Sequence, residues 1–215
     1  MNFDEFLLVA SKIKNIPLPA ESSQFKMVPS FRHEELRRQK DAVKQAKQAG
    51  VMALFYPKAN NKTHIILILR KTYKGVHSAQ VGFPGGKLEP EDDSIEAAAV
   101  RETFEEVGVP MHDIKVVREL SKVYIPPSNF YVFPFFGYCK WPPKFIKQDS
   151  EVERLIEVPL SEFLDDNNVI TNVVKASYSA EVEVPAFKLN EYVVWGATAM
   201  MLSEIKDLLK TAMLV

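Results

Sequence analysis

The sequence predicts one α/β domain, in which a mixed sheet lies between helices and a helical N-terminal extension, residues 1–50, precedes the core, residues 51–215. Two observations favour this fold class. Strand-like apolar runs and amphipathic helices follow one another without regular alternation, and no internal repeat or low-complexity tract divides the chain. A length of 215 residues, with 47% hydrophobic and 26% charged residues, suits a single globular domain.

Charge and cysteine content narrow the class of protein. The formal net charge of −1 gives no reason to expect nucleic acid or an anionic membrane as a partner. Cys139 is the single cysteine, which excludes an internal disulfide or a Cys-based metal site and suits a reducing compartment. Neither end of the chain resembles a targeting signal, and no apolar run approaches the roughly 20 residues of a membrane span. We therefore expect a cytoplasmic protein, monomeric or homodimeric.

The N-terminal extension is predicted to be helical. Residues 2–13 place Phe3 and Phe6 at the spacing of an amphipathic helix. Residues 31–48 also have a helical pattern, and Gly50 follows as a residue typical of a helix end. Basic side chains outnumber acidic ones in this second helix. Two interpretations stay open for them, a solvated face or a positive rim for phosphates.

The core begins with two apolar runs that predict neighbouring strands. They cover residues 51–57 and 64–70 and flank a turn-rich segment. The remaining elements follow the acidic stretch described next. They are strands over 114–125, 130–141, 151–160, 169–179 and 182–189, a short helix near 161–166, and an amphipathic helix over 196–211.

The stretch 81–109 gathers acidic side chains beside a glycine pair and predicts a helix with both ends marked. Asp93 is the expected N-cap, with Glu96 as its capping-box partner, and Gly108 suits the left-handed position past the C-terminus. An apolar stripe is expected to pack this helix on the core. Its members are Ala97, Val100, Phe104 and Val107.

Three glutamates of this helix share one patch. Glu102, Glu105 and Glu106 lie at i, i+3 and i+4, and Arg101 lies four residues before Glu105. The carboxylates repel one another and lie at the negative end of the helix dipole. A hard divalent cation such as Mg²⁺ would relieve both effects. Alone, such a patch is usually solvated surface; the adjacent glycine turn, in which Gly86 is expected to need a positive φ, favours a cation site.

The segment "RETFEEVGV", residues 101–109, resembles the Nudix box, G-x5-E-x7-R-E-U-x-E-E-x-G-U, in which U is apolar. Asp93 stands where the box has its first Glu, and Gly86 lies one residue further upstream than the general spacing. This longer form is similar to the coenzyme A pyrophosphatase branch of the Nudix hydrolases, as is the upstream segment "LILRKTYKGVHSAQVGFPGG". The upstream residues in register are Arg70, Phe83, Pro84, Gly85 and Gly86.

Three positions depart from the upstream pattern of that branch. Lys71 replaces a Ser, Gly75 the second Arg, and Ala79 a Gly. If the missing Arg contacts the coenzyme A moiety in the family, then Lys74 or His77 has to substitute for it. The departures leave the chemistry intact and open the question of the substrate.

The resemblance implies a Nudix-type α/β/α sandwich and Mg²⁺- or Mn²⁺-dependent hydrolysis of a nucleoside diphosphate linked to another group. By analogy, the metal ligands are Glu102 and Glu106, with Glu105 and the Gly86 carbonyl as further candidates. Arg101 is expected to orient the carboxylates, and Glu105 and Glu151 are the other catalytic candidates, Glu151 as the general base. Substrate contacts are expected from Arg70, Lys74, His77, Phe83 and Gly85.

Three functional hypotheses follow. The first is a coenzyme A pyrophosphatase that releases 3′,5′-ADP and 4′-phosphopantetheine, or its acyl derivative from an acyl-CoA. The alternative is a Nudix pyrophosphatase acting on ADP-ribose or another nucleotide. The third is a non-catalytic, nucleotide-binding protein of the Nudix fold. The retained set of mutually repelling carboxylates argues against the third.

Overall fold

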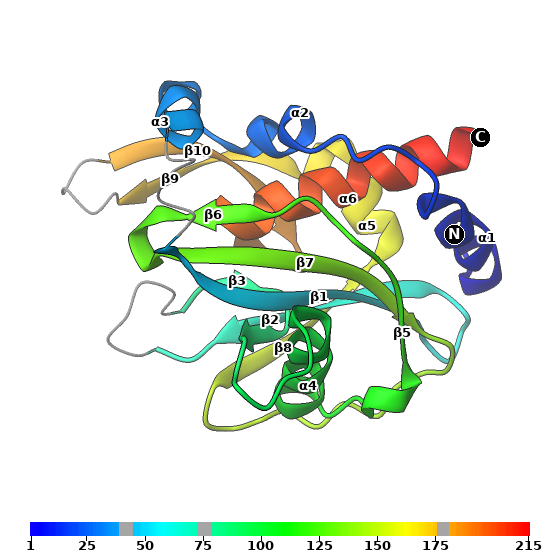
Figure 1. The fold of residues 1–215 in the computed structure, drawn as a ribbon. Coiled ribbons are helices and arrows are strands. Elements are labelled where there is room, and N and C mark those ends of the chain that lie inside the picture. Colours follow the sequence, from blue (N-terminus) through cyan, green and yellow to red (C-terminus); the bar gives the residue numbers. More distant parts are fainter. Residues whose placement is uncertain (39–44, 73–78, 176–180) are drawn as a thin grey trace.

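The computed structural model describes residues 1–38, 45–72, 79–175 and 181–215. A central sheet separates two helical layers: α4 covers one face, and α6 and α1 lie over the other (Figure 1). This arrangement confirms the predicted α/β fold with a mixed sheet and an N-terminal helix.

The described elements are as follows. The helices are α1 (Phe3–Ile13), α2 (Glu21–Gln24), α3 (His33–Arg38), α4 (Ile95–Val107), α5 (Leu160–Leu164) and α6 (Gly196–Leu214). The strands of the main sheet are β1 (Lys47–Pro57), β2 (Thr63–Arg70), β3 (Val81–Gly82), β4 (Gly85–Lys87), β5 (Ile114–Glu119), β6 (Val123–Ile125), β7 (Phe130–Cys139) and β8 (Val152–Pro159). The remaining strands are β9 (Val169–Lys175), β10 (Glu181–Leu189) and β11 (Tyr192–Val194).

Within the described residues, the main sheet has eight strands in the order β3-β2-β1-β7-β5, with β4 beside β1, β6 beside β7 and β8 beside β2. β1 and β7 run parallel, whereas the other pairs of this sheet are antiparallel. β9, β10 and β11 form a separate antiparallel sheet. The sequence pattern predicts β9 and β10 as strands but not that they leave the main sheet.

β1 carries the core on both of its faces. Met52, Leu54 and Tyr56 pack in the cluster beneath α4, whereas Ala53 and Phe55 pack in the cluster beneath α6 and α1. Because successive side chains of a strand point to opposite faces, this uninterrupted apolar run requires a helical layer on each side.

The predicted first helix is confirmed. Asn2 caps α1, and the side chain of Glu5 completes a capping box. Phe6 is fully buried, with its ring 4.9 Å from the ring of Phe55 and 6.1 Å from that of Phe136. These contacts attach the extension to the core.

The second predicted helix, over residues 31–48, is only partly present. It is helical over His33–Arg38, residues 39–44 lie outside the described part of the chain, and β1 has begun before residue 48. Gly50 therefore does not end a helix. It lies inside β1, where a Cβ would come within 2.3 Å of the Ile95 carbonyl oxygen in α4.

The two ends of α4 agree with the prediction only in part. Gly108 is left-handed, with a φ of 77°, and its N–H donates to the Phe104 carbonyl, as expected. The N-cap, however, is Ser94 rather than Asp93. Ser94 is extended, and its hydroxyl accepts from the Ala97 N–H at 3.1 Å.

The predicted apolar stripe of α4 is also wrong at its centre, since 45% of Phe104 is exposed. The close approach at Gly50 admits only small side chains, so the helix turns an alanine face to β1, and the Thr103 hydroxyl is satisfied by the Ala99 carbonyl at 2.6 Å. The buried residues are Ala98, Ala99, Thr103, Glu106 and Val107.

The cap assignment yields a test of stability. Replacing Ser94 with Ala removes the acceptor for the Ala97 N–H and should lower the free energy of unfolding by about 1 kcal/mol. Asp93→Ala is the matched control and should change it by less than about 0.5 kcal/mol. Urea unfolding of both variants checks this. A larger loss of unfolding free energy for Asp93→Ala than for Ser94→Ala would show that Asp93 is the N-cap after all.

Candidate active site

Glu106 is the most deeply buried carboxylate of α4, with 1% of its surface exposed. One oxygen accepts from the Gly85 N–H at 2.8 Å, and the other lies 3.4 Å from Nη2 of Arg70. Burial raises the pKa of Glu106 to about 7; Arg70 and the Gly85 N–H oppose the rise, whereas Glu102 and Glu151 add to it. Burial and the neighbouring negative charges therefore bring the pKa of this carboxyl close to neutral pH.

Glu102, one turn earlier, lies against the glycine turn. A Cβ on Gly86 would lie 2.2 Å from a carboxylate oxygen of Glu102. Burial raises the pKa of Glu102, Arg101 counteracts this, and Glu105 and Glu151 raise it further. Gly86 is therefore required for space. The expectation that it needs a positive φ is wrong, because Gly85 has the positive φ, 148°.

Arg101 connects the patch to the loop before α4. Its Nε and Nη2 each donate to the Asp92 carboxylate at 2.9 Å, and Nη2 also donates to the Lys87 carbonyl at 3.2 Å. Its Nη1 lies 3.2 Å from both Glu102 and Glu105. The bidentate pair lowers the pKa of Asp92.

Asp92, and not Asp93, is thus the carboxylate that holds Arg101. Sequence reasoning missed it, because alignment to the box places Asp93 at the first acidic position. The available signal was the spacing from Gly86: five residues separate it from Asp92, which is the G-x5-E spacing of the box.

Glu151 reaches the same site from the start of β8. Its side chain is exposed, and its carbonyl accepts from the Lys71 N–H at 2.8 Å. Its charge raises the pKa of both Glu102 and Glu106, so Glu151 lies within electrostatic range of both. The structure therefore places the candidate general base on the same side as the carboxylates predicted to bind metal, and the roles of all of them remain predictions.

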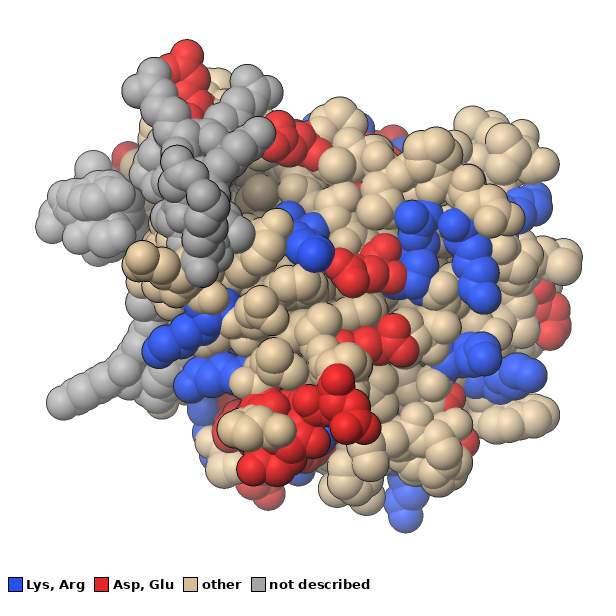
Figure 2. All heavy atoms as spheres, viewed as in Figure 1, with Lys and Arg blue, Asp and Glu red and all other residues tan. Residues whose placement is uncertain are grey.

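The carboxylates suit a divalent cation in their chemistry. They are oxygen donors, two of them are largely buried, and their mutual repulsion would be relieved by positive charge. Among the described residues no three acidic, histidine or cysteine side chains converge as a preformed metal cluster. In this arrangement Arg70 and Arg101 balance part of their charge. Figure 2 shows further acidic side chains gathered over α4.

The predicted substrate contacts are placed less favourably. Phe83 is 3% exposed and packs in the core beneath α6, so its side chain supports the fold. Gly85 donates its N–H to Glu106, and its carbonyl accepts from Arg70 at 3.4 Å. Lys74 and His77 lie outside the described residues.

Residues 46–176 match the NUDIX domain family, so the chain belongs to the Nudix hydrolases, as predicted. The peroxisomal coenzyme A diphosphatase ndx-8 of Caenorhabditis elegans is 31% identical over 155 residues, which are 71% of this chain and 64% of that protein. The chain thus covers less than two thirds of the worm protein's length.

Two further similarities support the family and the fold. The Nudix hydrolase NudL of Yersinia pestis is 30% identical over 142 residues, covering 66% of this chain and 70% of NudL. The crystal structure of RenU, a Nudix hydrolase from M. smegmatis, matches with a TM-score of 0.53 at 15% identity, over 77% of this chain and 87% of RenU. The second likeness shows the fold alone.

The space beside Gly86 can be tested with a pair of glycines. Gly86→Ala should displace the Glu102 carboxylate and lower hydrolytic turnover by about 10², the scale of losing one preorganised group. Gly82→Ala is the control, because its nearest neighbour outside the adjacent residues would be 3.9 Å away. Steady-state kinetics and circular dichroism check both variants. Full activity in Gly86→Ala would show that the glycine turn is not part of the active site.

The buried carboxylate predicts a pH dependence of stability in metal-free protein. The folded pKa of Glu106, about 7, lies above the unfolded value of 4.5, so the folded state binds the proton more tightly. Its stabilising contribution is full below pH 4.5 and is lost as the pH rises through 7, by about 3 kcal/mol.

Urea unfolding in EDTA, with Glu106→Gln as the reference, measures this loss. The difference in unfolding free energy between wild type and variant should fall with rising pH, and Mg²⁺ should reduce the fall because a cation favours the ionised carboxylate. A difference that stays constant between pH 4.5 and 8 would contradict the assignment.

Proposed function

We propose that this Nudix hydrolase cleaves the diphosphate linkage of coenzyme A or its acyl thioesters, with Mg²⁺ or Mn²⁺ as cofactor. The products are 3′,5′-ADP and 4′-phosphopantetheine or its acyl derivative. The observation that carries the proposal is the 31% identity with a coenzyme A diphosphatase over 155 residues, a stretch as long as 71% of this chain.

The metal would be held by Glu102 and Glu106, and Glu105 and the Gly86 carbonyl are further candidates. When bound, the ion supplies electrostatic stabilisation of developing negative charge and lowers the pKa of bound water. The carboxylates at this site are already constrained: Arg101 holds Glu102 and Glu105, and Arg70 holds Glu106.

The reaction requires a group that accepts a proton from the attacking water. The oxygen of water bonds to one phosphorus of the diphosphate, the bridging P–O bond breaks, and the second phosphate leaves with the electron pair. Glu151 is our candidate for accepting the proton of that water, because its carboxylate is exposed while its charge is felt by Glu102 and Glu106.

Recognition of the anionic substrate requires cations near the turn. Lys71 and Lys87 border the described site, and Lys74 and His77 remain predicted contacts. Lysine supplies charge without the bidentate grip of arginine, so we expect modest selectivity for the 3′-phosphate. Contacts from Arg70, which is engaged with Glu106, and from Gly85 are part of the same proposal.

The cellular setting is a separate proposal. The chain is expected to be cytoplasmic, whereas the worm relative is named as peroxisomal. Among the described helices, none is both long and apolar enough to cross a bilayer. A monomer or a homodimer, with a small nucleotide as its ligand and no nucleic acid partner, remains our expectation.

A hydrolysis screen tests the function. With Mg²⁺ or Mn²⁺, coenzyme A should be cleaved with a higher kcat/KM than ADP-ribose, NADH or diadenosine polyphosphates. Glu106→Gln should lower turnover by about 10² to 10³, whereas Glu96→Gln, on the exposed first turn of the same helix, should stay within about twofold of wild type. Faster cleavage of ADP-ribose would favour the alternative substrate, and no cleavage at all would favour a binding protein.

Removal of the 3′-phosphate tests recognition. Dephospho-coenzyme A should show a lower kcat/KM than coenzyme A, and Lys74→Ala should narrow the gap between the two. Equal values for both substrates in the wild-type enzyme would remove the 3′-phosphate from the recognised groups.

A further inference from the structure

The segment "KWPPKFIK", residues 140–147 between β7 and β8, exposes apolar and basic side chains together. We call this segment the basic loop. Trp141 is 74% exposed and Ile146 64%, and Lys140 and Lys144 are also exposed. The segment itself contains no acidic residue. Contiguous exposed apolar surface, in contrast to scattered single side chains, marks sites of contact with proteins or membranes.

The loop is held in a fixed position, so its apolar side chains have not simply failed to pack. The Ile146 N–H donates to the Val107 carbonyl at the end of α4, at 2.9 Å. The neighbouring Phe145 ring packs edge-on against Tyr56, at 5.0 Å between centroids. Anchored at these points, the loop presents Trp141 and Ile146 outward.

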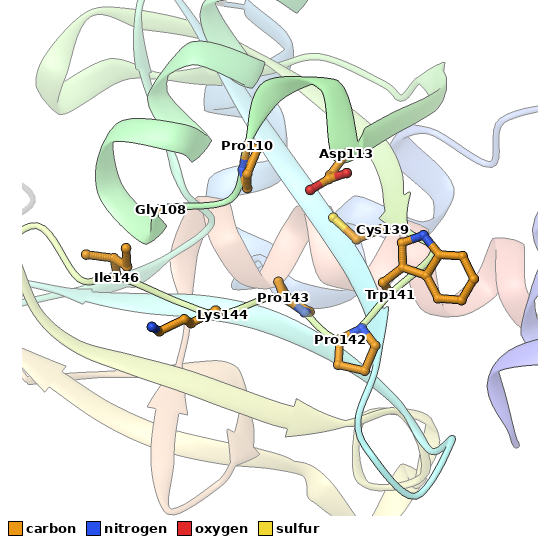
Figure 3. Close-up of a pocket in the computed structure, with 9 residues that line it drawn as sticks. All are labelled: Gly108, Pro110, Asp113, Cys139, Trp141, Pro142, Pro143, Lys144 and Ile146. Atoms are coloured by element: carbon orange, nitrogen blue, oxygen red, sulfur yellow. The ribbon is translucent and has the colours of Figure 1, made fainter.

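The exposed side chains border a shared hollow. Trp141, Lys144 and Ile146 are three of the residues that line this hollow of about 330 Å³, and Figure 3 shows Trp141 and Ile146 at its opposite ends, on the same loop. Trp141 also borders a second hollow of about 420 Å³, whose other wall includes Leu7 of α1. The surface of the basic loop therefore adjoins the N-terminal helix, across a hollow lined by both apolar and charged residues.

We propose that the basic loop binds the surface of an anionic lipid bilayer. A tryptophan has an apolar body with one polar N–H, which suits the region between headgroups and acyl chains. Lysines place their stems on apolar surface while their ammonium groups meet lipid phosphates or carboxylates. The net charge of −1 gave no reason to expect a membrane partner, but that average conceals this local concentration of lysine.

The charges around the loop refine the proposal. Lys147 is paired with Asp149 at 2.5 Å, Asp113 lies in the first hollow, and Asp4 and Lys58 both line the second. Lys140 and Lys144, on either side of Trp141 and its two prolines, are therefore the lysines assigned to the headgroups. A small apolar tip between two lysines fits peripheral attachment to a charged bilayer. If the loop instead contacts a protein, the vesicle experiments below will show no binding.

The experiment uses Trp141 as its own probe. In a Trp195→Phe variant, Trp141 is the remaining tryptophan. Its emission should shift to the blue with vesicles of phosphatidylcholine and phosphatidylserine, and the protein should cosediment with them. Vesicles of phosphatidylcholine alone, or high salt, should weaken both effects.

Variants assign the binding to the loop. Lys140→Ala and Lys144→Ala should each lower the partition coefficient by about fivefold, and Trp141→Ala should lower it as well. Lys188→Ala, an exposed lysine on β10, is the matched control and should leave it unchanged. Thermal unfolding and hydrolysis without vesicles should match wild type in all four variants, which separates this proposal from the catalytic one.

Three results would overturn the proposal. One is a lack of cosedimentation and of any emission shift with the anionic vesicles. Another is vesicle binding that survives all three loop substitutions. The third is a blue shift that grows with protein concentration in the absence of vesicles, which would assign the patch to contact between copies of the chain.

Discussion

The close approach of α4 to β1 is the constraint on which the site depends. At Gly50 the strand leaves no room for a Cβ, so the helix backbone lies against the sheet and presents Ala99 there. Hydrophobicity alone does not decide which face of such a helix is buried, because large side chains at the contact would keep the helix away from the sheet. Its orientation exposes Phe104 and buries Glu106.

Burial of a carboxylate is unfavourable unless partners compensate for it, and those partners build the site. Arg70 comes from the end of β2 and the Gly85 N–H from the start of β4, so Glu106 joins the two strands through its side chain. Arg101 does the same for the exposed side of the patch, where it joins α4 to Asp92. Two arginines thus keep several carboxylates close together in a small volume.

Local sequence signals predict most of the fold and of the site, and the features that they miss depend on contacts between residues far apart in the chain. The box, the left-handed Gly108 and the apolar strands are recognisable because each is decided within a few residues. The helix predicted over residues 31–48 is wrong at its C-terminal end, because residues 47–50 form a strand by parallel pairing with β7 and antiparallel pairing with β4, both far along the chain. The choice between Asp92 and Asp93, like the buried face of α4, depends on distances that a sequence does not display.

The segment between β7 and β8 connects the end of α4 with the candidate base Glu151. Its Ile146 and Gln148 N–H groups donate to the Val107 and Glu106 carbonyls, which would otherwise be unsatisfied at the end of α4. A few residues later the same segment places Glu151 opposite the patch. Glu106 is therefore fixed by its side chain from β2 and β4 and by its backbone from this segment. Any displacement of the segment would act on the candidate base and the buried carboxylate together.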